Sequence, residues 1–332
     1  KEYDAYGLGA ALVDTQVKVS DEKLQELGVE KGVMTLVDEA RQGELLEQLS
    51  GHLRDAIHRS GGSAGNSMIA TSEFGGTSFM CCKVANDLDG DIYLADLESC
   101  GVDHNLKDDR AQGTTGKCLV MITPDADRSM STFLGITEEL SQNELNYECI
   151  LKSKYVYIEG YLATSASGRS AAVQLREYAE KNDVRTALSF SDPGIVNSFS
   201  EEIAEIIGEK VDLIFCNEDE ALSWGNTKNL NQAISRLKEV TRTFVITLGE
   251  QGAITFDGEK QDHIHPEHVQ AIDTNGAGDM FAGAFLYALA RGEPYERAGR
   301  FANFAASKLV EYFGPRLPMA QYKKIKLAFF RE

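Results

Sequence analysis

One glycine-rich turn constrains this chain more than any other feature of its sequence. Residues 271–287 read AIDTNGAGDMFAGAFLY, in which an apolar approach runs through the turn into an apolar helical pattern. In this turn Gly276, Ala277 and Gly278 precede Asp279. Glycines let an anion approach the backbone closely, and the N–H groups at a helix N-terminus attract phosphate. The pattern predicts an anion site followed by a carboxylate base, and its alternative is an ordinary strand-to-helix turn with a capping Asp.

The charge balance limits the partners that this chain is expected to have. Lys and Arg total 33 against 52 Asp and Glu, for a formal net charge of −19. So acidic a surface argues against nucleic acid or an anionic membrane as the main partner. An anionic substrate would therefore need a local positive field from helix ends, a few basic side chains or Mg²⁺.

The remaining composition is typical of a cytoplasmic globular protein. Hydrophobic residues make up 42% of the sequence, and no apolar run reaches the length of a membrane span. The first residues, KEYDAYGLGA, do not have the character of a secretory signal. The six cysteines include no C-x-x-C pair, so we expect reduced thiols, most of them in the core.

Strand-like and helix-like patterns alternate along the chain, which predicts an α/β fold with a largely parallel sheet. We expect residues 1–332 to form one domain, with a small lid of strands made mainly from parts of 11–37 and 110–137, where the alternation breaks. Expected strands are 3–13, 77–84, 117–123, 155–159, 185–189, 213–216, 243–248 and 253–256. Expected helices lie around Leu24 and at 39–49, 61–71, 167–182, 201–207, 218–224, 229–239, 277–291 and 295–310.

A second glycine-rich turn, GGSAGN at 61–66, is a candidate for binding hydroxyl groups. Gly62 would let a hydroxyl reach backbone N–H groups, and Asn66 offers a donor and an acceptor in one side chain. Asp14, after the first strand, could accept two adjacent sugar hydroxyls. The alternatives are a tight loop at 61–66 and a solvated turn residue at Asp14.

Two further turns follow expected strands. Asn217 and Glu220 would share one helical face and could hold Mg²⁺ through water, although an acidic helix start is the alternative. Thr247 and Gly249 lie in a small turn that suits a nucleotide at a strand end.

Three other patterns give weaker evidence of a binding site. GTTGKC at 113–118 has the wrong spacing for a P-loop, and GLGAAL at 7–12 places Leu12 where a dinucleotide fingerprint needs its third glycine. HIHPEH at 263–268 could bind a metal, with an exposed loop as the alternative.

Taken in order, these segments resemble the ribokinase/phosphofructokinase-B carbohydrate kinases, and within them the adenosine kinase branch. The resemblance runs over nearly the whole chain, through GGSAGN, TTGKCLVMITPDADRSMSTFLG, YIEGYL, LSFSDPGIVNSF, VDLIFCNEDEA and DTNGAGD. It implies a ribokinase-like three-layer sandwich with a mostly parallel sheet and a β lid. It also implies ATP and Mg²⁺ as cofactors, with K⁺ in many members, and leaves monomer and homodimer open.

The resemblance implies a role for each candidate residue. Asp14, Gly62 and Asn66 would hold sugar hydroxyls, Glu220 with Asn217 would organise Mg²⁺ and its waters, and Asp279 would be the base. The other positions are Asn275 to Gly278 for the phosphates, Thr247, Gly249 and Asn303 beside ATP, and Asp273 with Gly314 at the monovalent-cation site.

Two departures bear on the substrate. Adenosine kinases look like G-x-N where this chain has Gly9-Ala10, and they carry an aromatic residue in place of Gly194. Stacking on such a ring is worth about 1–3 kcal/mol. We expect Tyr161 or Phe133, with Leu134, to supply contacts to the base instead.

These observations favour an ATP-dependent kinase that acts on the primary hydroxyl of a purine nucleoside, with adenosine to AMP as the first candidate. A sugar kinase for ribose, fructose or a related sugar is the second. A non-catalytic ligand-binding relative is an alternative of another class, and the intact Asp279 argues against it. A dinucleotide oxidoreductase is disfavoured by the missing third glycine.

Overall fold

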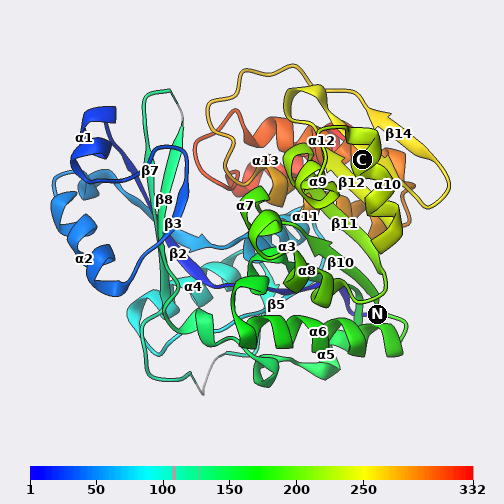
Figure 1. Ribbon diagram of the computed structural model, residues 1–332, viewed down its shortest axis with the longest axis horizontal. Coiled ribbons are helices and arrows are strands. Elements are labelled where there is room, and N and C mark those ends of the chain that lie inside the picture. Colours follow the sequence, from blue (N-terminus) through cyan, green and yellow to red (C-terminus); the bar gives the residue numbers. More distant parts are fainter. Residues whose placement is uncertain (107–109, 126, 332) are drawn as a thin grey trace.

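A nine-stranded sheet with helices on both faces forms the larger part of the molecule (Figure 1). The computed structural model describes residues 1–106, 110–125 and 127–331. The strand order is β14-β13-β12-β11-β10-β9-β1-β5-β6, and all pairs are parallel except those that β13 and β14 make at one end. Its strands are β1 (Tyr3–Leu8), β5 (Ser78–Cys81), β6 (Val102–Asp103), β9 (Ser153–Glu159), β10 (Arg185–Ser189), β11 (Val211–Asn217), β12 (Thr241–Thr247), β13 (Ala253–Phe256) and β14 (Gln261–Ile264).

Successive residues of each central strand contribute to apolar clusters on opposite faces of this sheet. In β9, Tyr155 and Tyr157 belong to one cluster, whereas Val156 and Ile158 belong to the other. A parallel sheet that is covered on both sides requires such continuous apolar runs. One face carries α3 (Ser63–Glu73), α4 (Leu88–Ser99), α11 (Ala277–Ala290), α12 (Tyr295–Leu309) and α13 (Met319–Phe330); the other carries α5 (Tyr147–Leu151), α6 (Ala166–Lys181), α7 (Pro193–Ser198), α8 (Ser200–Ile207), α9 (Glu218–Gly225) and α10 (Leu230–Val240). The predicted α/β class is confirmed.

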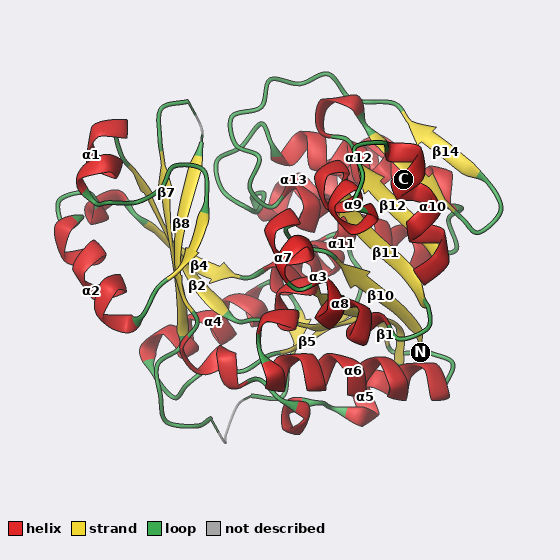
Figure 2. Cartoon of the chain, in the orientation of Figure 1, coloured by secondary structure: helices red, strands yellow, loops and turns green. Residues whose placement is uncertain are grey.

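A second, five-stranded sheet stands beside this body, with order β3-β8-β7-β2-β4 (Figure 2). Its strands are β2 (Leu12–Lys18), β3 (Met34–Leu36), β4 (Ile57–Gly61), β7 (Gly116–Ile122) and β8 (Arg128–Phe133). Helices α1 (Asp21–Glu26) and α2 (Glu39–Gln48) pack on one face of this sheet, and Leu12, Cys118 and Val120 lie on the other. Four of its five strands lie within 11–37 and 110–137, the segments expected to form a lid, and β4 lies elsewhere. Ala126, in the second of these segments, is not among the residues that the structure describes.

The expected single strand at 3–13 is wrong, because β1 ends at Leu8 and β2 begins at Leu12 in the other sheet. The chain crosses between the sheets at Gly9, where space is short. A Cβ at Gly9 would lie 2.3 Å from Glu159 Oε2 and 2.6 Å from Ala64 Cβ. Helix α4, which was not predicted, packs against β4 near this crossing.

None of the described helices combines the length and apolar character that a membrane crossing requires.

Helices α3 and α11 approach each other closely because Gly283 has no side chain. A Cβ on Gly283 would lie 2.4 Å from Ser67 O and 2.6 Å from Ala70 Cβ. Thr71 Oγ1 donates a hydrogen bond of 3.0 Å to Gly283 O across the same contact. This contact holds α11 against α3 near the middle of both helices.

We expect Gly283→Ala to destabilise the protein by about 1–3 kcal/mol, because the added methyl group would force the two helices apart. The matched control is Gly43→Ala in α2, where a Cβ would meet nothing within 4 Å. That change should be neutral or stabilising by about 0.5–1 kcal/mol. Urea unfolding of both variants measures the difference, and equal effects would contradict the packing role of Gly283.

Candidate active site

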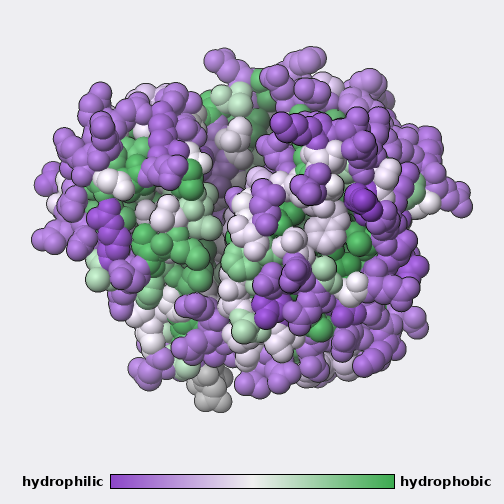
Figure 3. Space-filling view, viewed as in Figure 1, coloured by the Kyte–Doolittle hydropathy of each residue, from purple (hydrophilic) through white to green (hydrophobic). Residues whose placement is uncertain are grey.

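A cavity of about 500 Å³ lies between the two sheets. Figure 3 shows apolar side chains gathered on the second sheet's side of the hollow. On the opposite side the cavity wall includes polar side chains from the carboxyl ends of β9, β10, β11 and β12, namely Glu159, Ser189, Asn217 and Thr247. Parallel α/β sheets bind their ligands at this edge.

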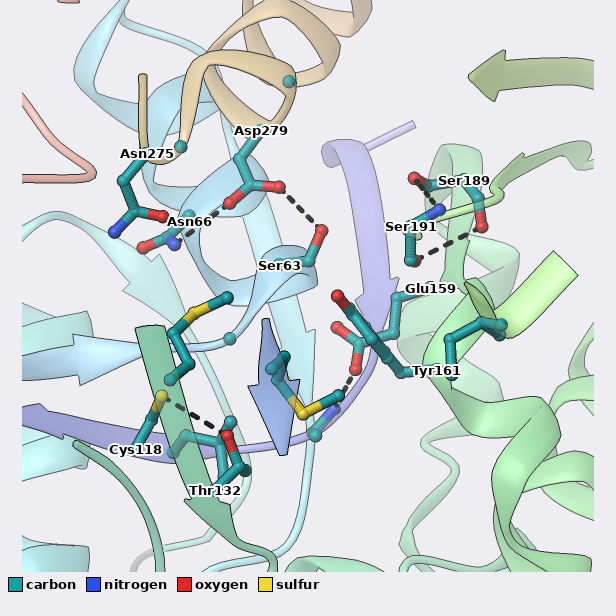
Figure 4. A pocket seen from close by; sticks show the side chains of 18 of the residues that line it. Ser63, Asn66, Cys118, Thr132, Glu159, Tyr161, Ser189, Ser191, Asn275 and Asp279 are labelled. Atoms are coloured by element: carbon teal, nitrogen blue, oxygen red, sulfur yellow. Dashed lines mark hydrogen bonds between the residues drawn. The ribbon is translucent and has the colours of Figure 1, made fainter. Parts of the chain in front are cut away.

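Asp279 lies in the first turn of α11 and points into the cavity (Figure 4). Ser63 Oγ donates to its Oδ1 at 2.6 Å, and Asn66 Nδ2 donates to its Oδ2 at 3.1 Å. Burial raises the pKa of Asp279 to about 6, although both hydrogen bonds act to lower it. A carboxylate with such a pKa is ionised at neutral pH and is basic enough to accept a proton.

The turn before Asp279 needs its glycine. Gly276 has a φ of 72°, in the left-handed region, and a Cβ there would lie 2.5 Å from Pro315 O. Gly276, Ala277 and Gly278 all line the cavity at the N-terminus of the 14-residue helix α11. The arrangement suits an anion, because the positive end of a helix dipole meets the cavity here.

Asp14 faces this turn from the second sheet. Its side chain is 7% exposed and lies against Gly61, where a Cβ would come within 2.1 Å of Asp14 Oδ1. Burial raises the pKa of Asp14 to about 7, and the charges of Arg316 and Arg128 oppose the shift. Across the cavity, the Oδ1 atom of Asn66 is buried without a hydrogen-bond partner among the described residues. Asp14 and this amide oxygen therefore retain unused capacity to accept hydrogen bonds.

Asn217 and Glu220 line the same cavity and bond to each other. Glu220 Oε2 accepts from Asn217 N at 2.9 Å, Glu220 Oε1 accepts from Asn217 Nδ2 at 2.9 Å, and Asn217 Oδ1 accepts from Glu220 N at 2.8 Å. The pair is thus a capping box that starts α9. Burial raises the pKa of Glu220 to about 7, with Asp192, Asp219 and Asp279 adding negative charge nearby.

Asp273 and Gly314 are in direct contact. Gly314 N donates to Asp273 Oδ2 at 2.7 Å, and Asn275 N donates to Asp273 Oδ1 at 2.8 Å. Arg128 of β8 forms an ion pair with the same carboxylate. The carboxylate of Asp273 is therefore surrounded by protein donors.

The structure brings most of the predicted residues to the cavity. Gly62, Tyr161, Thr247, Gly249 and Asn275 line it. Four predicted residues are not among its lining residues: Phe133, Asp273, Asn303 and Gly314. Leu134 does line it, in place of its neighbour Phe133, and Asn303 Nδ2 donates to His265 O at 3.1 Å.

Four residues at or near the cavity were missed by sequence reasoning. Ser63 holds Asp279 and sits inside the GGSAGN turn itself, so its position was a usable signal. Glu159 ends the apolar run YVYIE, where a lone carboxylate is unusual. Arg128 and Arg316 gave no local signal, since their partners are distant in sequence: Arg316 donates to Asp96 Oδ2 at 2.6 Å and to Ser60 O at 3.0 Å.

Comparison with known proteins decides the family. A model of the pfkB family carbohydrate kinases matches residues 36–321. The chain belongs to this family. The family is one of ATP-dependent kinases, so the protein is a kinase that uses ATP and, as is typical of such enzymes, Mg²⁺.

Individual relatives agree with this membership. The adenosine kinase of Schizosaccharomyces pombe is 26% identical to the chain, with 96% of the chain and 97% of that protein covered. The structure of adenosine kinase from Sinorhizobium meliloti superposes with a TM-score of 0.90 at 30% identity, covering 98% of this chain and 99% of that one. A probable sugar kinase from Rhizobium etli gives a TM-score of 0.91 at 29% identity, with 98% of both chains covered. The predicted ribokinase-like fold and adenosine kinase resemblance are confirmed.

We expect Asp279→Asn to lower turnover by about 10²–10⁴-fold while ATP binding stays nearly intact, because the amide cannot accept the proton. In the wild type, protonation of Asp279 should remove activity as the pH falls below about 6. Asp14, Glu159 and Glu220 have pKa values raised to about 7, so the acid limb of log(kcat/KM) should lie between about 6 and 7. Near-normal turnover of the variant would refute the role of Asp279.

Proposed function

We propose that this kinase transfers the γ-phosphate of ATP to the primary hydroxyl of a purine nucleoside, with adenosine as the first substrate. One observation carries the proposal: Asp279, at the helix N-terminus of α11, shares a cavity with Asp14 and the unpartnered Oδ1 of Asn66. The first group suits proton removal and the other two suit sugar hydroxyls. The named adenosine kinases among the relatives support the choice of nucleoside.

In the proposed reaction, Asp279 accepts the proton of the substrate hydroxyl as its oxygen attacks the γ-phosphorus. The bond from the γ-phosphorus to the bridging oxygen breaks, and ADP leaves. The N–H groups at residues 276–278 would stabilise the negative charge on the transferred group. Thr247, Gly249 and Asn303 would lie beside ATP. The second sheet would close over the cavity as a lid and exclude water.

Mg²⁺ bound with ATP would neutralise phosphate charge. Glu220 and Asn217 fit the ion's waters, because Glu220 is buried at the cavity with excess negative charge around it. We also retain K⁺ at Asp273 and Gly314 as a prediction, together with a cytoplasmic location and a small-molecule partner.

The cavity wall opposite Asp279 favours a nucleoside over a free sugar as the substrate. Leu12, Met34, Leu36, Cys118 and Met130 of the second sheet line this wall. A purine buries much apolar surface against such a wall, whereas ribose has little to bury. Tyr161 and Leu134 would add contacts to the purine, since Ala10 and Gly194 offer no polar or aromatic side chain.

A panel of adenosine, inosine, 2′-deoxyadenosine and ribose, each with ATP, tests the substrate. We expect adenosine and inosine to be phosphorylated, and loss of the 2′-hydroxyl to cost more than a change at the base, because Asp14 and Asn66 bind the sugar. Asp14→Ala should severely reduce activity on every substrate. If ribose is turned over far better than any nucleoside, the sugar kinase alternative replaces this proposal.

Glu220→Gln tests the metal role separately. The Gln side chain can still accept from Asn217 N, so α9 should keep that bond of its cap, but it loses the acceptor for Asn217 Nδ2 and should orient metal-bound water poorly. We expect a higher Mg²⁺ concentration for half-maximal rate, with a loss of stability of about 1–3 kcal/mol from the broken bond. An unchanged Mg²⁺ dependence would leave Glu220 as a capping residue alone.

A further inference from the structure

Two of the chain segments that join the sheets run side by side. The first, residues 9–11, leads from β1 to β2, and the second, residues 61–64, leads from β4 into the start of α3. They touch each other: Gly62 has a φ of 89°, and a Cβ there would lie 2.3 Å from Ala10 O. We call these segments the two crossings.

One buried carboxylate binds both crossings. Glu159 ends β9 in the central sheet and is 1% exposed. Its Oε1 accepts from Ala10 N at 2.8 Å, and its Oε2 accepts from Ala64 N at 2.9 Å. Figure 4 shows the carboxylate at the cavity wall below Ser63. A third bond fixes the first crossing independently, from Ala11 N to Thr137 Oγ1 at 2.9 Å.

We propose that Glu159 is a positioning residue that clamps the two crossings to the central sheet and thereby sets where Asp14 stands relative to Asp279. Asp14 lies just beyond the first crossing. Ser63 lies in the second crossing and Asn66 just beyond it, and both hold Asp279. A buried ionised group that accepts two backbone N–H bonds makes strong contacts and is costly to remove. The clamp therefore acts on the distance between the groups that bind the acceptor and the group that deprotonates it.

The clamp has an expected kinetic signature, which rests on the function proposed above. The acceptor would touch side chains from both sheets, whereas the anion site at 276–278 belongs to the central body alone. Loosening the clamp should therefore weaken the acceptor's binding far more than that of ATP. A general loss of stability would instead lower the active fraction and leave both KM values unchanged.

Burial raises the pKa of Glu159 to about 7, against the effect of its two backbone bonds. Charged and titratable groups that face it are Asp279, Tyr93, Tyr157, Tyr161 and Cys82. The ionised form offers both acceptors, and protonation converts one of them to a donor. The clamp is thus complete above about pH 7 and is lost as the pH falls through that value.

Hydrogen exchange of individual amides in the unliganded protein tests the clamp directly. In Glu159→Gln we expect exchange at Ala10 or Ala64 to rise by about 10- to 100-fold, because the amide side chain keeps only one acceptor. Exchange at Ala11 should change least. The control is Glu144→Gln, which replaces a carboxylate that accepts from Ser141 N at 2.8 Å and bonds to neither Ala10 nor Ala64. Unchanged exchange at both Ala10 and Ala64 would overturn the proposal.

Kinetics of the same variants test the consequence. We expect Glu159→Gln to raise the KM for adenosine at least about 10-fold and to leave the KM for ATP within about twofold, with Glu144→Gln like the wild type. A similar fold-change in the KM values for adenosine and for ATP would overturn the positioning role of Glu159. If the wild type phosphorylates no acceptor, the proposed function fails, and the exchange data still decide the clamp.

A wild-type measurement covers the case in which Glu159→Gln does not fold. After correction for intrinsic rates, protection of Ala10 and Ala64 should fall as the pH drops from 8 to 6, while Ala11, bonded to a neutral hydroxyl, stays protected. Parallel behaviour of all three amides would count against the clamp.

Discussion

The shared burial of four carboxylates around one cavity is the constraint on which the rest of this structure depends. Asp14, Glu159, Glu220 and Asp279 come from four different elements, and burial raises the pKa of each to between about 6 and 7. Like charges in a poorly solvated space repel one another, so each needs compensation. Glu159 and Glu220 accept backbone N–H groups, Asp279 accepts from two side chains, and Asp14 has arginines nearby. Burial of these groups in one space therefore favours their protonated forms, and a cation or hydroxyl donors bound there would stabilise the ionised forms.

The architecture explains why these groups meet. The carboxyl ends of the central strands supply polar side chains along one edge, and α11 directs its N-terminus at the same place because Gly283 lets it lie close to α3. The second sheet then closes the other side with an apolar wall. Its outer face is covered by α1 and α2, so both of its faces have a defined role.

The local sequence pattern was sufficient to predict much of the fold and the centre of the candidate site. The strand at 213–216 is a continuous apolar run and the helix at 277–291 is apolar over most of its length, and DTNGAGD encodes its turn within a few residues. The break at Gly9, by contrast, depends on Glu159 and Ala64, which lie far along the chain. Arg316 pairs with Asp96 at a separation of 220 residues, a contact that no local window contains. The residues expected to contact the purine were also hard to predict. Leu134 and not Phe133 faces the cavity, and one residue of register along a strand end decides this.

The hydrogen bond between Ser63 and Asp279 joins residues 216 positions apart. A ribosome makes Ser63, at the start of α3, long before Asp279 in α11. The segment before residue 277 contains all the described strands and both crossings, but not Asp279, the proposed base. Only when α11 docks against α3 do the two halves of the chemistry meet. Because this contact closes so long a loop of chain, we expect the complete cavity to form late in folding.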